Sequence, residues 1–151
     1  MRVLFVCTAN VCRSPMAEVL FNDLVGEKGL SFRAGSAGIS ALTNRDMAPN
    51  ARRVLEEVGV RVGRHRARQV SGEMVERADL VLTMGPRHSA ALSRSFGPSE
   101  KTHTLQGYIG AVADEEIPDP YGLTMLAYRA SARQIFDCVE RVVERLESSS
   151  Q

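Results

Sequence analysis

The 151-residue sequence has no long hydrophobic run and no excess of charge of one sign. Its N-terminal apolar stretch, residues 3–6, is far too short for the core of a signal peptide or for a membrane span, and no later segment qualifies. The net charge of +1 gives no sign of binding to nucleic acid or to an acidic membrane surface. We therefore expect a cytoplasmic protein with no membrane or nucleic acid partner.

Cysteine and histidine are scarce as well. The chain has three of each, scattered along its length: Cys7, Cys12, Cys138, His65, His88 and His103. This set forms neither a disulfide framework nor a zinc motif. Histidines so far apart would have to converge from distant segments to hold a metal ion. We therefore expect no metal and no cofactor.

The composition is otherwise that of an ordinary globular domain, with 44% hydrophobic and 25% charged residues. The length suits one domain, which we assign to residues 1–147, and the polar residues 148–151 are expected to fray. Of the 19 basic residues only Lys28 and Lys101 are lysines. We interpret most of the arginines as solvated surface. The segment 61–68, which carries four of them, is a candidate for attracting acidic substrates.

Strand patterns recur along the chain. Continuous apolar runs at residues 2–6 and 78–84 indicate strands that are buried on both faces of a parallel sheet. Weaker patterns indicate two more strands, near residues 32–36 and 102–105.

Helical patterns alternate with these strands. Ser14-Pro15 is typical of the start of a helix, and apolar residues at helical spacing between 51 and 58 end at Gly59, a natural helix terminator. Further helices are expected from Pro86 to about Ser95 and over 126–146, where Cys138 lies on the apolar side. The alternation predicts a doubly wound, Rossmann-like α/β domain, in which helices flank a four-stranded parallel sheet on both faces.

The segment after the first expected strand contains a cysteine, five intervening residues, an arginine and a serine, since residues 7–14 are CTANVCRS. In so arginine-rich a chain this spacing alone is a weak signal. Its position is more specific, because ligands of parallel α/β folds bind beyond the carboxyl ends of the strands. The loop also leads directly into a helix.

Such a loop has the chemistry of a phosphate site. Its backbone N–H groups and the helix N-terminus form a cradle for anions, and Arg13 adds a planar, bidentate grip on phosphate oxygens. The same positive field should stabilise the thiolate of Cys7, which would then be a nucleophile beneath the bound phosphate. We expect Ser14 to cap the helix and to donate a hydrogen bond to this sulfur.

Phosphoryl transfer to Cys7 needs a proton donor for the departing group, and Asp119 is the best candidate. Pro118 and Pro120 stiffen the backbone on both sides of it. By itself this pattern would indicate an ordinary turn. Beside the loop of Cys7 it indicates a general acid.

Several motifs, in order and over essentially the whole chain, resemble the low-molecular-weight protein tyrosine phosphatase family. They are residues 6–18 (VCTANVCRSPMAE), 36–38 (SAG), 65–69 (HRARQ), 78–84 (ADLVLTM) and 119–122 (DPYG). Several motifs in the family's order make the match highly specific.

The resemblance implies a two-step reaction. Cys7 attacks phosphorus while Arg13 holds the phosphoryl oxygens. Asp119 protonates the leaving group and then activates the water that hydrolyses the phosphocysteine. The resemblance also implies that Asn10 shapes the loop through contacts with the supporting residues Ser36 and His65. We expect the substrate, a phosphoprotein, or a free oxyanion such as phosphate to contact eight residues: Thr8, Ala9, Asn10, Val11, Cys12, Ser14, Leu42 and Tyr121.

Two features depart from the tyrosine-specific members. No aromatic residue occurs at 39–44, where many members have one wall of the phosphotyrosine slot, and Gly122 replaces a second aromatic residue. The Asp-Pro-Tyr-Gly form is closer to a bacterial branch that includes protein-arginine phosphatases, but that branch usually has threonine where this chain has Val11. We expect a protein-tyrosine phosphatase, with Val11, Leu42 and Tyr121 around the slot. Protein-arginine phosphatase is the alternative.

Two other functions compete. An arsenate reductase of this fold would need resolving cysteines, yet none occurs between Cys12 and Cys138. A phosphate-binding module without activity would have no use for both Cys7 and Asp119. Cys12 is either a small apolar filler or the partner of Cys7 in a reversible disulfide that prevents further oxidation.

Overall fold

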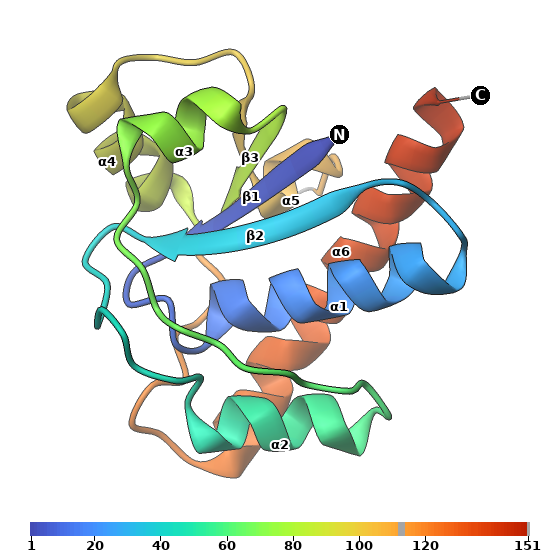
Figure 1. Ribbon diagram of the computed structural model, residues 1–151. Coiled ribbons are helices and arrows are strands. Elements are labelled where there is room, and N and C mark those ends of the chain that lie inside the picture. Colours follow the sequence, from blue (N-terminus) through green and yellow to red (C-terminus); the bar gives the residue numbers. More distant parts are fainter. Residues whose placement is uncertain (112–113, 151) are drawn as a thin grey trace.

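The computed structural model describes residues 1–111 and 114–150, which form a four-stranded parallel sheet with helices on both faces (Figure 1). The strands lie in the order β2-β1-β3-β4, and their bounds are β1 (Arg2–Cys7), β2 (Arg33–Gly38), β3 (Leu80–Thr83) and β4 (Thr102–Thr104). The helices are α1 (Arg13–Glu27), α2 (Pro49–Glu57), α3 (Gly72–Arg77), α4 (Pro86–Phe96), α5 (Leu105–Tyr108) and α6 (Met125–Ser149). The predicted doubly wound α/β fold is confirmed.

Both faces of the sheet are covered by apolar side chains. Helices α1, α2 and α6 lie on one face, and α3 and α4 lie on the other (Figure 1). Successive residues of β1 point to opposite faces. Phe5 therefore packs edge-on against Phe21 of α1, while Leu4 and Val6 pack in the second layer with Leu92 of α4. Burial on both sides explains why the strands are continuous apolar runs in the sequence.

Side chains protect the outer edge of β2, which is an edge strand. The amide of Asn22 in α1 bonds both the N–H and the carbonyl of Ala34, at 2.9 and 3.1 Å. Two residues further on, Arg68 Nε donates to the carbonyl of Ser36 at 2.9 Å, and Gly38 pairs with the segment around Gln69. These contacts leave little of the edge free for pairing with another chain.

The predicted elements agree with the structure to within a few residues, including the short strand β4. Gly59 and Gly97 follow α2 and α4 with φ of 80° and 87°, a conformation that glycine adopts without strain. The two short helices α3 and α5, of six and four residues, were not predicted, because such lengths show no apolar periodicity.

The start of α1 differs from the prediction. The helix begins at Arg13, so Ser14 lies inside its first turn and is not the capping residue, and Cys12 at the cap position makes no side-chain capping bond. The Ser14 hydroxyl is instead engaged by Cys7 and Asn10. The loop therefore uses the hydroxyl that would have capped the helix.

The last helix runs from Met125 to Ser149, so it continues into the segment 148–151 that we expected to fray. Gln151 lies outside the described residues, and the assignment of residues 1–147 to one domain stays a prediction. None of the helices in the described part of the chain combines the length and the apolar character needed to cross a membrane.

Candidate active site

In the loop between β1 and α1, each of the six carbonyl groups of residues 7–12 accepts a hydrogen bond. Those of residues 7, 8 and 9 accept hydrogen bonds from the N–H groups of residues 39, 40 and 42. The carbonyl of Asn10 accepts from His65 Nε2 at 2.7 Å, that of Val11 from the N–H of Ala48, and that of Cys12 from the N–H of Met16. Within the described chain, no group accepts a hydrogen bond from the N–H groups of residues 9–12. The loop therefore has free donors for an anion.

Glycine at position 38 makes this close packing possible. A Cβ atom there would lie 2.4 Å from the carbonyl oxygen of Thr8 and 3.1 Å from the backbone of Ala9 and Asn10. Such distances are far below van der Waals contact, so any side chain at Gly38 would push the loop away from the end of β2. The SAG segment of residues 36–38 is thus part of the scaffold of the loop.

Asn10 fixes the shape of the loop from inside. It is fully buried and has a positive φ of 61°, a conformation in which asparagine is one of the few tolerated side chains. Its Nδ2 donates to Ser14 Oγ at 2.8 Å and to Ser36 Oγ at 2.9 Å, and its Oδ1 accepts from the N–H of Arg68 at 3.0 Å. The structure therefore brings together Asn10, Ser36 and His65, as the family resemblance implied.

Cys7 is buried at the end of β1, with its Sγ 2.9 Å from Ser14 Oγ. Since the Ser14 hydroxyl already accepts from Asn10, its own hydrogen is free to point at the sulfur, and the other acceptor in reach, the carbonyl of Ala37, is 3.5 Å away. A hydrogen bond from Ser14 would stabilise a thiolate at Cys7. The serine thus lies where the sequence argument needed it, as a donor to sulfur.

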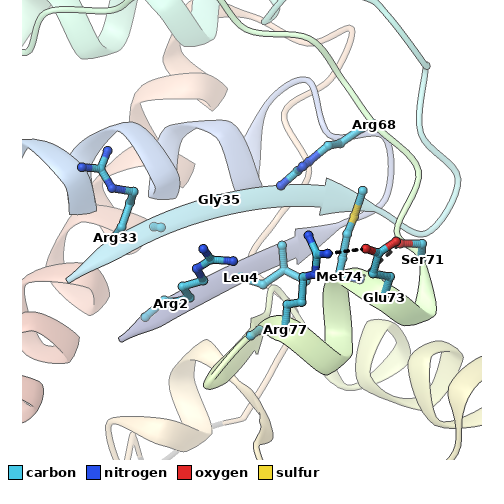
Figure 2. Close-up of a pocket in the computed structure, with 12 residues that line it drawn as sticks. Arg2, Leu4, Arg33, Gly35, Arg68, Ser71, Glu73, Met74 and Arg77 are labelled. Carbon is cyan, nitrogen blue, oxygen red and sulfur yellow. Dashed lines mark hydrogen bonds and ion pairs between the residues drawn. The ribbon is translucent and has the colours of Figure 1, made fainter.

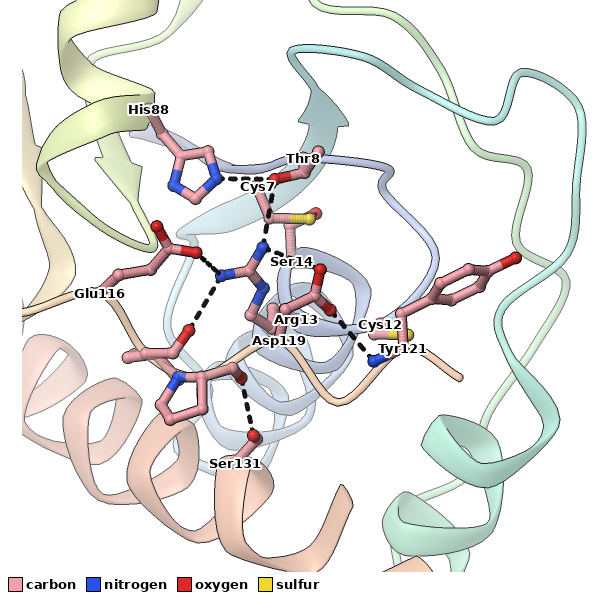
Figure 3. Close-up of polar contacts among 12 residues, drawn as sticks. Cys7, Thr8, Cys12, Arg13, Ser14, His88, Glu116, Asp119, Tyr121 and Ser131 are labelled. Carbon is pink, nitrogen blue, oxygen red and sulfur yellow. Dashed lines mark hydrogen bonds and ion pairs between the residues drawn. The ribbon is translucent and has the colours of Figure 1, made fainter. Parts of the chain in front are cut away.

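Arg13 is 1% exposed and lies among four oxygen ligands (Figure 3). Its Nη1 donates to Glu116 Oε2 and to the carbonyl of Ile117, both at 2.8 Å. Its Nη2 donates to Thr8 Oγ1 at 3.2 Å and lies 3.4 Å from Asp119 Oδ2. These contacts fix the guanidinium at the mouth of the loop.

Glu116 is the main anionic partner of this arginine, and sequence reasoning missed it. Its other oxygen pairs with Arg87 at the start of α4. The hydrogen bond from Arg87, reinforced by Arg13, outweighs partial burial and lowers the pKa of Glu116 to about 2. A Cβ at Gly85 would lie 2.7 Å from the Cβ of Glu116, so the absence of a side chain at Gly85 leaves room for the side chain of Glu116. Gly85 and Arg87 follow the carboxyl end of β3. Such positions border ligand sites in parallel α/β folds, so the sequence carried a signal for this part of the site.

Asp119 lies beside the Arg13 guanidinium, in the loop before α6. Its Oδ1 accepts from the N–H of Tyr121 at 3.1 Å, and its side chain is 38% exposed. Ser131 of α6 donates to the carbonyl of Pro118 at 2.7 Å and so holds this loop in place (Figure 3). The carboxyl is aimed at the site and open to solvent, which is what a group that exchanges protons requires.

The remaining predicted residues differ in burial. Val11, within the loop, is 3% exposed and belongs to the core, Leu42 is half-buried and bonds to Ala9 through its backbone, and Tyr121 is 48% exposed in the loop before α6. A slot between Leu42 and Tyr121 stays a prediction.

Cys12 is a buried, free thiol. Its Sγ lies 3.4 Å from the hydroxyl of Tyr128 in α6, and burial raises its pKa to about 12. Disulfide exchange needs an attacking thiolate, so this environment disfavours attack by Cys12. The expected alternatives for Cys12, filler or redox partner of Cys7, both stay open.

A separate hollow of about 420 Å³ lies over β1 and β2 on the side of α3 (Figure 2). Its rim carries Arg2, Arg33, Arg68 and Arg77, and Glu73 pairs with Arg77 at 2.8 Å. Neither a cysteine nor an aspartate lines it. The chemistry expected from the sequence is therefore found at the loop of Cys7 and not in this hollow.

Comparison with known proteins identifies relatives over almost the full chain. Residues 2–151 match the family described as low molecular weight phosphotyrosine protein phosphatase. A protein-arginine-phosphatase of Bacillus subtilis (strain 168) is 32% identical over 147 residues, which are 97% of each chain.

Two solved structures superpose closely. A mutant of the YwlE arginine phosphatase with a phosphorylated active-site serine has a TM-score of 0.92 at 31% identity, covering 97% of this chain and 96% of that chain. The low molecular weight protein tyrosine phosphatase from T. tengcongensis has a TM-score of 0.91 at 35% identity, covering 96% and 99%.

The low pKa of Glu116 predicts a pH-dependent contribution to stability. The carboxylate is favoured in the folded chain, so its contribution is complete above the ordinary value of 4.5 and is lost as the pH falls toward about 2. We expect Glu116→Gln to lower the free energy of unfolding, measured by urea titration, most at neutral pH and progressively less between pH 4.5 and 2. The exposed Glu140→Gln is the matched control. A deficit for Glu116→Gln that stays constant with pH would contradict this role.

Proposed function

Because the chain belongs to the low molecular weight phosphotyrosine protein phosphatase family, we propose that it hydrolyses phosphoproteins, preferably at phosphotyrosine, through a phosphocysteine on Cys7. The observation that carries the proposal is the loop of residues 7–12. All its carbonyl groups are engaged, whereas the N–H groups of residues 9–12 have no acceptor in the described chain. A bound phosphoryl group would supply that acceptor.

In the first step the Cys7 thiolate attacks phosphorus, and an S–P bond forms as the P–O bond to the tyrosine breaks. Arg13 and the free N–H groups stabilise the charge on the phosphoryl oxygens, since donors fixed in advance need little reorganisation. Asp119 gives its proton to the departing phenolate oxygen. Its place beside Arg13 Nη2 and its open carboxyl support this assignment.

In the second step a water molecule attacks the phosphocysteine, and the Asp119 carboxylate takes its proton. The S–P bond breaks, phosphate leaves and the thiolate is restored, with Ser14 as hydrogen-bond donor to the sulfur. The phosphorylated active-site serine in the YwlE mutant shows that, in that relative, a residue of the active site carries phosphate. We transfer this covalent step to Cys7.

The preference for phosphotyrosine rests on the residues around the loop. A phosphotyrosine ring is flat and apolar, and the exposed ring of Tyr121 and the half-buried Leu42 offer it apolar contact. A phosphoarginine guanidinium would instead need hydrogen-bond acceptors near the entrance. Val11 has no side-chain oxygen to offer. Phosphoarginine is the second candidate, because relatives named protein-arginine-phosphatase match 97% of the chain.

The reductase alternative is less well supported. Cys12 is held as a neutral thiol by burial, and Cys138 is buried on α6 within the core. A reductase would need a thiolate to resolve an oxidised Cys7, and burial disfavours the thiolate of Cys12. The cytoplasmic location stays a prediction, which fits a nucleophilic thiol that has to remain reduced.

Replacing the nucleophile should separate binding from turnover. We expect Cys7→Ser to lose turnover of a phosphotyrosine peptide while sulfate or vanadate still binds, because the N–H groups and Arg13 remain. Steady-state kinetics and calorimetric titration measure the two properties. Cys138→Ser, in the core, should keep its activity. More than about a tenth of wild-type turnover in Cys7→Ser would remove Cys7 from the role of nucleophile.

The loss of rate on replacing the general acid should depend on the leaving group of the substrate. We expect Asp119→Ala to slow hydrolysis of phosphotyrosine by roughly 10²–10⁴-fold. Aryl phosphates with acidic phenols should lose less, because their leaving groups need little protonation. The exposed Asp137→Ala is the control. Equal losses across phenols of different basicity would mean that Asp119 has only a structural role.

Substrate choice can be tested directly with phosphotyrosine and phosphoarginine versions of one peptide. We expect kcat/KM to be higher for phosphotyrosine, to rise in Leu42→Trp and to shift toward phosphoarginine in Val11→Thr. Val58→Thr makes the same chemical change on the exposed end of α2 and should leave the ratio unchanged. A wild-type kcat/KM that is higher for phosphoarginine would overturn the proposed preference.

A further inference from the structure

The hydroxyl of Thr8 lies where three nitrogen atoms meet. Thr8 Oγ1 is 3.2 Å from Arg13 Nη2, 2.9 Å from Arg87 Nη2 and 2.9 Å from His88 Nε2. Figure 3 shows the first and last of these contacts, with His88 reaching the loop from α4. The reaction described above assigns no role to His88.

The hydrogen atoms available at this oxygen determine the protonation state and the tautomer of His88. A guanidinium group can only donate, so Arg13 and Arg87 occupy both lone pairs of the Thr8 oxygen. The single hydroxyl hydrogen is then left for His88, whose Nε2 has to accept it. His88 is therefore neutral, with its ring hydrogen on Nδ1.

The surroundings of His88 favour the neutral form of the ring. The side chain is fully buried, and among the described residues its Nδ1 has no hydrogen-bond partner. The charged groups that face it are Arg13, Arg87, Glu116 and Asp119. Burial, together with the two arginines, lowers the pKa of His88 to about 4.

We propose that neutral His88 is a positioning residue for the phosphate clamp. By accepting the Thr8 hydroxyl hydrogen, it turns the lone pairs of that oxygen toward Arg13 and keeps the guanidinium at the mouth of the loop. Protonation would place a hydrogen on Nε2 against Thr8 and add a third positive charge beside Arg13 and Arg87. The inference rests on the proposed function, but measurements of sulfate binding test it without any turnover.

The tautomer can be read from the wild-type protein. In long-range ¹H–¹⁵N spectra at neutral pH, we expect His88 to carry its hydrogen on Nδ1 and to show an unprotonated Nε2. The spectrum of His88→Gln identifies the signals. A hydrogen on Nε2 would overturn the proposal, whatever the enzyme hydrolyses.

Sulfate binding tests the consequence for Arg13. His88→Phe keeps a ring of similar size but has no acceptor, and we expect it to weaken sulfate binding roughly tenfold, as for one hydrogen bond in a charged network. His88→Gln offers an amide oxygen near the position of Nε2 and should restore most of the affinity. The control is His103→Phe, at an exposed histidine that packs against Tyr108. Equal affinities in His88→Phe and His88→Gln would overturn the proposal.

A double variant and a pH series separate positioning from general packing. In a Thr8→Val background, His88→Phe should add little further loss, because the shared hydrogen bond is already gone. Sulfate keeps its charge as the pH falls toward about 4, and over this range the pH profile of wild-type affinity should show an ionisation that is absent from His88→Gln. Additive losses, or identical pH profiles for wild type and His88→Gln, would refute the positioning role.

Discussion

The direction of the peptide groups between Cys7 and Cys12 is the constraint on which the site depends. A buried carbonyl without a partner is costly, and the chain supplies a donor for each of the six. The donors come from residues 39–42, from His65, from Ala48 and from the first turn of α1. Once the carbonyl groups are fixed outward, the N–H groups have no acceptor within the described chain. The anion site thus exists before the anion arrives, which is the preorganisation that phosphoryl transfer needs.

A buried arginine next to that loop creates a second requirement, because an unpaired charge at 1% exposure would be strongly destabilising. Glu116 and Asp119 both pair with this arginine, but their contacts differ in length. Glu116 makes the short contact, and its low pKa keeps it ionised throughout the physiological range. Asp119 makes only the longer contact of 3.4 Å and is open to solvent. Because Glu116 holds Arg13 by a short contact, the proton transfers proposed for Asp119 would not leave the arginine without a carboxylate partner.

The fold could be predicted from the sequence because it depends on short-range rules, and the same rules place Cys7 and Arg13 in one loop. Buried strands appear as apolar runs, and the residue after the first strand is Cys7, followed at fixed spacing by Arg13. The partners that hold these residues come from distant segments and leave no local pattern. Glu116 is one of several acidic residues in its region of the sequence, and His88 is a single histidine at a helix start. Ser14 was predicted as the helix cap because a serine before a proline is often one. In the structure its hydroxyl instead contacts Cys7 and Asn10.

The cradle itself cannot select the phosphorylated residue. Structures of an arginine phosphatase and of a tyrosine phosphatase superpose on this chain with TM-scores of 0.92 and 0.91, so the backbone is common to both activities. In the proposed mechanism the free N–H groups and Arg13 would contact only phosphoryl oxygens, which phosphotyrosine and phosphoarginine share. Discrimination must then come from side chains at the entrance, where the two substrates differ in polarity. We expect Leu42 and Tyr121 to present carbon there, and the side chain of Val11 has no hydrogen-bond acceptor. We therefore expect selectivity to be carried by a few side chains around an anion site that both activities share.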